Sequence, residues 1–222
     1  MDSLRILLVD DHLLFRKGLM RLLDVQPDFI VVGEAQDGLE AIEEARRLRP
    51  DVVLMDIKMP RCDGLEATRR IKTQIPEVRV VMLTVSDDEQ DLVTAVKYGA
   101  DGYLLKDLQP EELFDQLRRI GEGAAPLSRG MTGKLLSQLA RRSRSVPEPK
   151  AAAVLSAREC EVLALVVEGL TNREIGEELG IARNTVKNHL RSIFAKLDVR
   201  NRTEATGYAV AHGLVCLPDR AG

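Results

Sequence analysis

Cysteine is scarce in this sequence, and long apolar runs are absent. The three cysteines, Cys62, Cys160 and Cys216, lie far apart and show no spacing typical of a metal site or a redox pair. Their isolation favours a reducing compartment, the cytoplasm. The sequence also has no apolar segment typical of a secretory signal peptide and no stretch long enough to cross a bilayer. We therefore expect a cytoplasmic protein without a membrane partner.

The net charge of −3 hides an uneven distribution of charge along the chain. Residues 1–124 contain 17 Lys and Arg and 25 Asp and Glu, a balance of −8, whereas residues 125–222 contain 15 and 10, a balance of +5. The 222 residues are enough for one or two domains with cores of their own. An acidic half joined to a basic half predicts two tasks, with the basic one on nucleic acid.

Five apolar runs alternate with five segments of helical periodicity in the acidic half. The run Asp51–Asp56 has four apolar residues in succession, as expected for a strand buried on both faces. The other runs lie at about 5–9, 29–32, 78–84 and 102–106, and the helical segments lie at about 13–25, 37–48, 64–74, 88–98 and 110–121. This alternation predicts an α/β fold with a flavodoxin-like, doubly wound, five-stranded parallel sheet.

Polar side chains end four of these runs: Asp10, Asp11, Asp56, Thr84 and Lys106. The carboxyl ends of parallel strands meet at one edge of a sheet, so we expect these side chains to lie together. Three carboxylates in one pocket repel one another and need a cation nearby to remain ionised. Mg²⁺ suits such oxygen ligands, and Lys106 adds a fixed positive charge. The set predicts a site for a phosphoryl group carried on a carboxylate.

Each member of this set also has an ordinary explanation. A strand-terminal Asp is most often a helix cap or a loop residue, Thr84 alone would be a plain strand residue, and Lys106 alone would be solvated. His12 is interpreted as a surface or first-turn residue. The functional interpretation depends on the joint pattern, because all five would otherwise fall at one sheet edge by accident.

Residues 4–122 resemble the receiver domain of bacterial two-component response regulators, on the strength of these five residues. The resemblance implies that Asp56 is the phosphoacceptor. It also implies that Asp11, Asp56 and the backbone carbonyl of Lys58 bind Mg²⁺ directly, with Asp10 helping through water.

The same resemblance gives roles to the other strand ends. Thr84 and Lys106 would contact the phosphoryl oxygens, and Tyr103 would be the aromatic switch residue that reorients with Thr84, although a half-buried strand tyrosine is the simpler interpretation. Many receivers have a proline after the lysine, whereas this chain has Asp107.

Residues 124–151 are interpreted as a linker. Residues 128–140 are compatible with a short helix, and residues 141–150 are polar, basic and proline-bearing, as expected for an exposed tether. We therefore expect a receiver domain at 1–123 and a second domain at 152–216.

Two capping boxes, Ser156–Glu159 and Thr171–Glu174, predict the starts of two short helices in the basic half. Gly180 ends the second, and a longer helix follows from about Arg183 to Leu197. Short helices joined by a tight glycine turn are typical of a helix-turn-helix.

The longer helix has two distinct faces. Helical spacing places four apolar residues on a core face: Val186, Leu190, Ile193 and Leu197. The opposite face holds Asn184, Asn188, Arg191 and Ala195, with Lys187 at its flank, and these are side chains suited to base edges in a major groove. Thr185 and Lys196 lie to one side, where phosphates are expected. A merely solvated face is the alternative.

Residues 152–214 resemble the LuxR-type four-helix DNA-binding domain through an ordered series of short motifs: Leu155–Glu159, Gly169, Asn172, Glu174–Ile175, Leu179–Ile181, Thr185–Leu190 and Lys196–Thr203. Both halves together resemble a NarL/FixJ-type response regulator. The resemblance implies that Lys187, Asn188 and Arg191 face bases and that Thr185, Lys196 and Arg202 face phosphates. The last helix, around 204–212, would pair two subunits. Two departures are Ala182, where Ser or Thr usually caps the helix, and Asn188, where an apolar residue is common.

The combined prediction is a phosphorylation-activated transcriptional regulator, not an enzyme beyond its own phosphoryl transfer and autodephosphorylation. A sensor histidine kinase would donate the phosphoryl group to Asp56, and the protein would bind double-stranded promoter DNA as a homodimer, with RNA polymerase as a further partner.

Two alternatives remain open. A phosphatase with an aspartyl nucleophile, of the haloacid-dehalogenase type, needs Asp-x-Asp at the end of the first strand, and Asp10-Asp11-His12 lacks that spacing. A phosphorylation-independent binder or scaffold would carry a vestigial pocket, and the intact set of polar residues argues against it.

Overall fold

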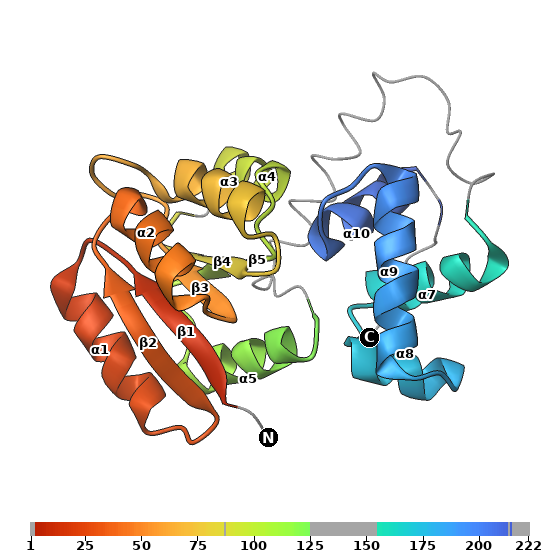
Figure 1. Cartoon of the computed structure of the whole chain (residues 1–222), viewed down its shortest axis with the longest axis horizontal. Coiled ribbons are helices and arrows are strands. Elements are labelled where there is room, and N and C mark those ends of the chain that lie inside the picture. The colour runs from red at the N-terminus through yellow and green to blue at the C-terminus, as the bar shows by residue number, and fades with distance from the viewer. Residues whose placement is uncertain (1–2, 87, 125–154, 213, 215–222) are drawn as a thin grey trace. The chain divides into compact units, whose positions relative to one another are not determined.

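The computed structural model describes residues 3–86, 88–124, 155–212 and 214 (Figure 1). The chain divides into two compact units after Gly121. The helix expected at 128–140 and most of the proposed linker lie outside the described residues.

The first unit is built on five parallel strands. They are β1 (Leu4–Val9), β2 (Phe29–Ala35), β3 (Val52–Met55), β4 (Arg79–Thr84) and β5 (Gly102–Leu105). Their order in the sheet is β2-β1-β3-β4-β5, and each neighbouring pair is parallel. The doubly wound, flavodoxin-like sheet expected from the sequence is confirmed, and the reversal of strand order lies between β1 and β3, where ligands bind in such sheets.

Five helices connect and cover the strands: α1 (Leu13–Asp24), α2 (Gly38–Leu48), α3 (Gly64–Gln74), α4 (Glu89–Lys97) and α5 (Pro110–Gly121). Helices α1 and α5 pack on one face of the sheet, and α2, α3 and α4 follow one another across the other face (Figure 1). Successive side chains of a strand point to opposite faces, so Leu8 and Leu54 join the core under α1 and α5 while Val9 and Met55 are buried on the other side.

Side-chain caps place the starts of three of these helices next to the strand ends. The carboxylates of Asp37, Asp63 and Asp88 accept backbone N–H groups at the starts of α2, α3 and α4. Each cap satisfies donors that have no partner within the helix. The boundaries of all five helices agree with those expected from the sequence to within one residue.

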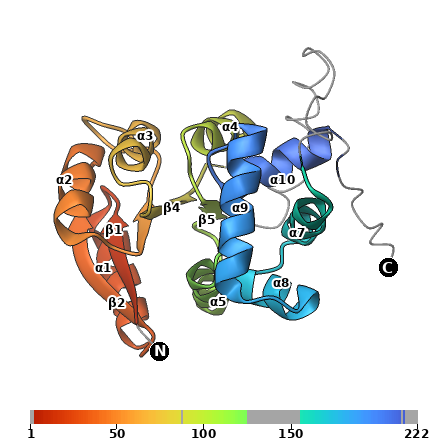
Figure 2. The same cartoon turned by 45° about the vertical axis from the view of Figure 1, so that its right-hand side comes forward.

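The second unit contains α7 (Ala157–Val167), α8 (Asn172–Leu179), α9 (Arg183–Leu197) and α10 (Arg202–Ala211). Both predicted capping boxes are formed, with Ser156 paired to Glu159 and Thr171 paired to Glu174. Helix α9 packs against the other three helices, as Figure 2 shows. Its four predicted core residues are buried in one apolar cluster with side chains of α7, α8 and α10.

The turn between α8 and α9 depends on two glycines. Gly180 ends α8 with φ +64, a left-handed conformation that glycine adopts without the steric penalty of a side chain. A Cβ on Gly176 would lie 2.7 Å from the carbonyl oxygen of Ile181, so only glycine allows the two helices to approach this closely. Ala182, in contrast, provides no side-chain cap for α9, as expected from the sequence.

A charge pair between a buried carboxylate and a solvent-accessible lysine connects α7 to α9. Glu159 is 4% exposed, and its carboxylate accepts hydrogen bonds from Ser192 Oγ and Lys196 Nζ, both at 2.6 Å. The Ser156 N–H donates to it as well, at 2.7 Å. Burial acts to raise the pKa of Glu159, but the hydrogen bonds from Lys196, Ser192 and Ser156 outweigh burial and lower the pKa to about 2.

This shift predicts an acid-sensitive second unit. The folded-state pKa lies below the unfolded value of roughly 4.3, so the ionised carboxylate stabilises the fold above that value, by on the order of 2 kcal/mol. That stability is lost as the pH falls from about 5 towards 2. Hydrogen exchange of α7 and α9 amides, corrected for intrinsic rates, should show protection falling across this window in the wild type and falling less in Glu159→Gln. Equal pH dependence in the two proteins would refute the assignment.

Candidate functional site

The five polar strand-end residues predicted from the sequence lie at the carboxyl edge of the sheet. Asp56 follows β3, and its N–H donates to the carbonyl of Val9 in β1 at 2.9 Å. The N–H of Lys106, after β5, donates to the carbonyl of Thr84 in β4 at 2.9 Å. Sheet-like hydrogen bonding therefore continues past the strand ends and holds the functional residues in register.

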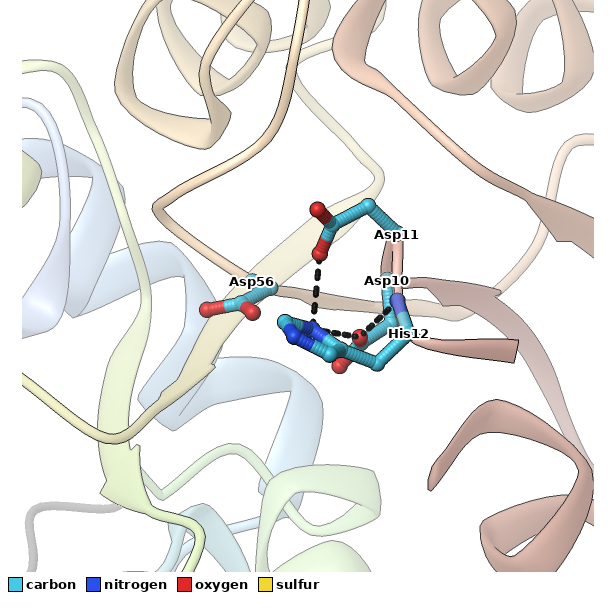
Figure 3. Close-up of side chains that lie close together, drawn as sticks. All are labelled: Asp10, Asp11, His12 and Asp56. Carbon is cyan, nitrogen blue, oxygen red and sulfur yellow. Dashed lines mark hydrogen bonds and ion pairs between the residues drawn. The ribbon is translucent and has the colours of Figure 1, made fainter. Parts of the chain in front are cut away.

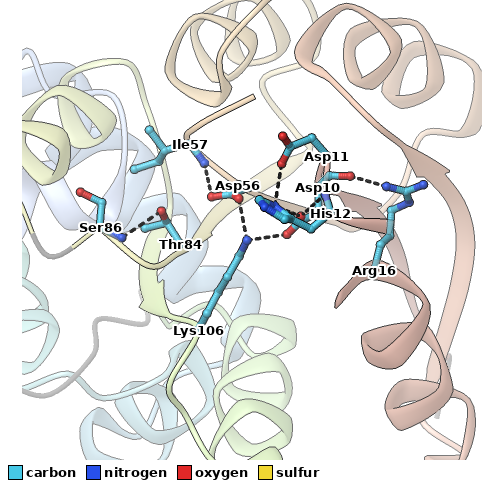
Figure 4. A network of polar contacts seen from close by, with 9 residues as sticks. All are labelled: Asp10, Asp11, His12, Arg16, Asp56, Ile57, Thr84, Ser86 and Lys106. Carbon is cyan, nitrogen blue, oxygen red and sulfur yellow. Dashed lines mark hydrogen bonds and ion pairs between the residues drawn. The ribbon is translucent and has the colours of Figure 1, made fainter. Parts of the chain in front are cut away.

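The ammonium of Lys106 joins two carboxylates that belong to different strands. Its Nζ lies 2.5 Å from Asp56 Oδ2 and 2.6 Å from Asp10 Oδ2, and Figure 4 shows it between them. All three side chains are less than 10% exposed. The Nζ also lies 4.5 Å from the centre of the Phe15 ring in α1, where the π face favours a cation.

The charges around Lys106 determine its ionisation. Burial acts to lower the pKa of its ammonium, but the hydrogen bonds and charges of Asp10 and Asp56 outweigh burial and raise the pKa above its ordinary value. The ammonium therefore remains protonated at neutral pH and offsets part of the repulsion between the two carboxylates.

Asp11 and His12 complete a cluster of potential metal ligands with Asp10 and Asp56 (Figure 3). One ligand atom from each of the four residues lies within 4.8 Å of the others. Three carboxylates from two strand ends match the oxygen ligands that Mg²⁺ prefers. Their combined charge exceeds that of Lys106 alone, so the donor set fits a divalent cation.

The loop from β3 to α3 brings its backbone close to Asp56. A Cβ on Gly64 would overlap the carbonyl oxygen of Asp56, and the Gly64 N–H donates to the Ile57 carbonyl at 2.8 Å. The Asp56 carboxylate accepts the Ile57 N–H at 2.7 Å. Lys58 lies exposed in this loop, and the metal contact of its carbonyl stays a prediction.

Thr84, Ser86 and Tyr103 form a second group at the same edge. The Ser86 N–H donates to Thr84 Oγ1 at 3.2 Å, and the buried Tyr103 hydroxyl donates to the Ser86 carbonyl at 2.9 Å (Figure 4 for Thr84 and Ser86). The Ser86 hydroxyl donates to Asp91 in the first turn of α4 at 2.7 Å. A movement of Thr84 would therefore displace Ser86 and, through Asp91, the start of α4.

The sequence interpretation missed three residues of this site: His12, Phe15 and Arg16. The guanidinium of Arg16 donates to the backbone carbonyl of Asp10 and pairs with Glu34 of β2 at 3.0 Å. All three occupy the first turn and a half after the Asp10–Asp11 pair, with spacings of three and four residues that place them near one another on a helix. This spacing in the sequence could have indicated that the three side chains lie close to the site.

The outer face of α9 is exposed as predicted. Asn184, Thr185, Lys187, Asn188 and Arg191 are all exposed, and α9 contains no acidic residue.

Two further residues expected at DNA make contacts within the second unit. Lys196 Nζ is engaged by the buried Glu159, and Arg202 is only 8% exposed. The Arg202 guanidinium donates to the carbonyl of Leu170 and to Asn172 Oδ1, the latter at 3.1 Å. The phosphate contacts expected of Lys196 and Arg202 stay predictions.

Within the described ranges, no helix combines the length and the apolar character that a bilayer crossing requires.

Two family models match the chain, one in each half. Residues 6–118 match the family described as "Response regulator receiver domain", and residues 153–209 match "Bacterial regulatory proteins, luxR family".

Curated relatives match nearly the whole length. The chain is 42% identical over 212 residues to the transcriptional regulatory protein LiaR of Bacillus subtilis, covering 96% of this chain and 99% of LiaR. It is 40% identical over 200 residues to the nitrate/nitrite response regulator protein NarL of Escherichia coli K12, covering 90% and 92% of the two chains. Among solved structures, the response regulator ChrA of a heme-sensing two-component system aligns with a TM-score of 0.52 and 37% identity, over 96% of this chain and 100% of ChrA.

The pairing of Lys106 predicts how the site responds to its removal. Lys106→Met leaves two buried carboxylates without their cation, so the metal-free protein should lose on the order of 3 kcal/mol of stability. Added Mg²⁺ should then raise the thermal midpoint more in this variant than in the wild type, because the ion meets more uncompensated negative charge. Thermal unfolding followed by circular dichroism, in EDTA and in Mg²⁺, measures both effects. Lys58→Met, which removes an exposed lysine of the adjacent loop, is the control. An equal Mg²⁺ response in all three proteins would contradict the prediction.

Proposed function

Because the chain belongs to the response regulators of two-component systems, in the NarL/FixJ-type group that joins a receiver domain to a LuxR-type DNA-binding domain, we propose that phosphorylation of Asp56 controls its binding to promoter DNA. The observation that supports this most strongly is the sharing of one ammonium, that of Lys106, by Asp56 and Asp10. The protein is a transcriptional regulator and not a conventional enzyme.

The phosphoryl transfer follows from the position of Asp56. An oxygen of its carboxylate attacks the phosphorus of a phosphohistidine in a sensor histidine kinase, the P–N bond breaks, and the imidazole leaves with the electron pair. Lys106, already within hydrogen-bond distance of Asp56, neutralises charge on the phosphoryl oxygens. Asp11, Asp56 and the Lys58 carbonyl would hold Mg²⁺, with Asp10 acting through water. The ion would supply further neutralisation of the phosphoryl oxygens.

A surface beside this pocket supports the approach of a protein donor. A cavity of about 340 Å³ lies between α1, β5 and α5, and its lining includes Phe15, Leu105, Lys106 and Leu113. Leu14, at its rim, is 88% exposed. We assign this apolar surface to the histidine kinase, because a kinase whose phosphohistidine reaches Asp56 must also contact the surface next to Lys106.

The switch uses the second group of residues. A phosphoryl group on Asp56 attracts the Thr84 hydroxyl, which then gives up the Ser86 N–H. Ser86 is also bonded to Tyr103 and Asp91, so its displacement changes the packing of Tyr103 and the start of α4. This change at the β4–α4 surface frees the second unit or promotes pairing of two chains.

The DNA-binding step rests on the exposed face of α9. Lys187, Asn188 and Arg191 reach base edges in the major groove, and Asn184 lies on the same exposed face of the helix. Thr185, Lys196 and Arg202 would face the DNA phosphates. Two chains would place two such helices in successive grooves, and RNA polymerase would be the partner of the assembled complex. The function operates in the cytoplasm, where the DNA lies.

The assignment of Asp56 predicts a simple labelling result. Asp56→Asn should abolish incorporation of phosphate from acetyl phosphate in the presence of Mg²⁺, because an amide oxygen is not a sufficient nucleophile. Asp107→Asn, which changes an exposed carboxylate next to Lys106, should retain labelling. Full labelling of Asp56→Asn would refute the assignment. Hydrolysis of a small phosphate ester that is lost in Asp10→Asn but kept in Asp56→Asn would favour the phosphatase alternative.

The assignment of the α9 face predicts separable effects on DNA. On a site selected from random sequence by the wild type, Lys187→Ala and Arg191→Ala should each cost about 1–3 kcal/mol of binding free energy and relax the sequence preference. Lys58→Ala, on the other unit, should change neither quantity. Fluorescence anisotropy at several salt concentrations measures both. An unchanged preference in the two α9 variants would show that another face reads the DNA.

A further inference from the structure

The side chain of His12 contacts the acidic cluster and does not cap the helix that it precedes. It is the N-cap residue of α1, yet its side chain makes no capping hydrogen bond. Its Nδ1 lies instead 2.9 Å from Asp11 Oδ1 and 3.4 Å from Asp10 Oδ1. Figure 3 shows the imidazole among the carboxylates of the cluster, with contacts to both Asp11 and Asp10.

The carboxylates of the cluster have two neighbouring nitrogen groups. Lys106 pairs with Asp10 and Asp56, whereas the imidazole of His12 has its shortest contact with Asp11. Asp11 is also one of the two carboxylates, with Asp56, that we propose to contact the metal directly. An ion bound by Asp11 therefore arrives beside the imidazole, and the His12 side chain is 72% exposed and able to adjust its ring position.

We propose that His12 supplies a nitrogen ligand to this site, so that the site prefers a first-row transition ion such as Mn²⁺, Co²⁺ or Ni²⁺ more strongly than an all-oxygen receiver site would. The proposal rests on the metal site of the proposed function and adds its ligand class. Imidazole favours the later first-row ions such as Co²⁺ and Ni²⁺ most strongly and Mn²⁺ less so, whereas Mg²⁺ prefers oxygen ligands and water. The ligand atoms of all four residues already lie within 4.8 Å of one another.

The sequence makes this proposal easy to test, because the chain contains only three histidines: His12, His189 and His212. The experiment uses the intact chain loaded with Mn²⁺ alone at a fixed, mildly alkaline pH. Electron spin-echo envelope modulation of the bound Mn²⁺ detects a coordinated nitrogen directly. The wild type and the control His189→Gln, which changes a residue of α9, should show the nitrogen coupling, and His12→Gln should lose it.

Competition binding gives a second readout. The affinity for Ni²⁺ or Mn²⁺ relative to Mg²⁺ should fall by about tenfold or more in His12→Gln and should remain unchanged in His189→Gln. The absence of a nitrogen coupling in the wild type, or an unchanged affinity ratio in His12→Gln, would overturn the proposal.

The outcomes also separate this proposal from the function on which it rests. If His12→Gln keeps the wild-type ion preference and Asp56 is still labelled by acetyl phosphate with Mg²⁺, the imidazole ligand is refuted and the proposed function stands. If Asp11→Asn binds Mn²⁺ as tightly as the wild type does, both the metal site of the proposed function and its imidazole ligand are refuted.

Discussion

The repulsion between carboxylates gathered at one sheet edge is the constraint on which the first unit depends. Asp10 and Asp56 are both 4% exposed, so water screens their charges poorly, and Lys106 makes their proximity possible. A site held together in this way responds to any new charge, because a metal ion or a phosphoryl group competes for the same oxygens and the same ammonium. The close packing of charges that buries Asp10 and Asp56 therefore also makes the site sensitive to an added ion or phosphoryl group.

The second unit uses the same physics for a different purpose. The buried carboxylate of Glu159 on α7 is compensated by Lys196 near the end of α9. This pair does not face a reactant; it orients one long helix against another and leaves the opposite face of α9 open. In both units an ion pair between residues distant in sequence connects neighbouring elements.

The sequence was sufficient to predict the fold and the convergence of the receiver residues, because apolar runs, caps and capping boxes are local signals and a parallel sheet brings strand ends together. It was not sufficient to predict which cation pairs with which carboxylate. The contact of Lys196 with Glu159 and the burial of Arg202 are two features that the sequence did not predict. The interpretation of His12 as a surface or first-turn residue is confirmed by its 72% exposed side chain, but its contacts with Asp10 and Asp11 depend on the turn between β1 and α1 and were not predicted.

The central claim is that these convergent residues make Asp56, and no other carboxylate of the pocket, the phosphoacceptor. Borohydride reduction of the phosphorylated chain converts an aspartyl phosphate to homoserine, and peptide mass spectrometry locates the converted residue. The account predicts homoserine at position 56 alone. Homoserine at position 10 or 11, or its absence from a chain that has incorporated phosphate, would contradict it.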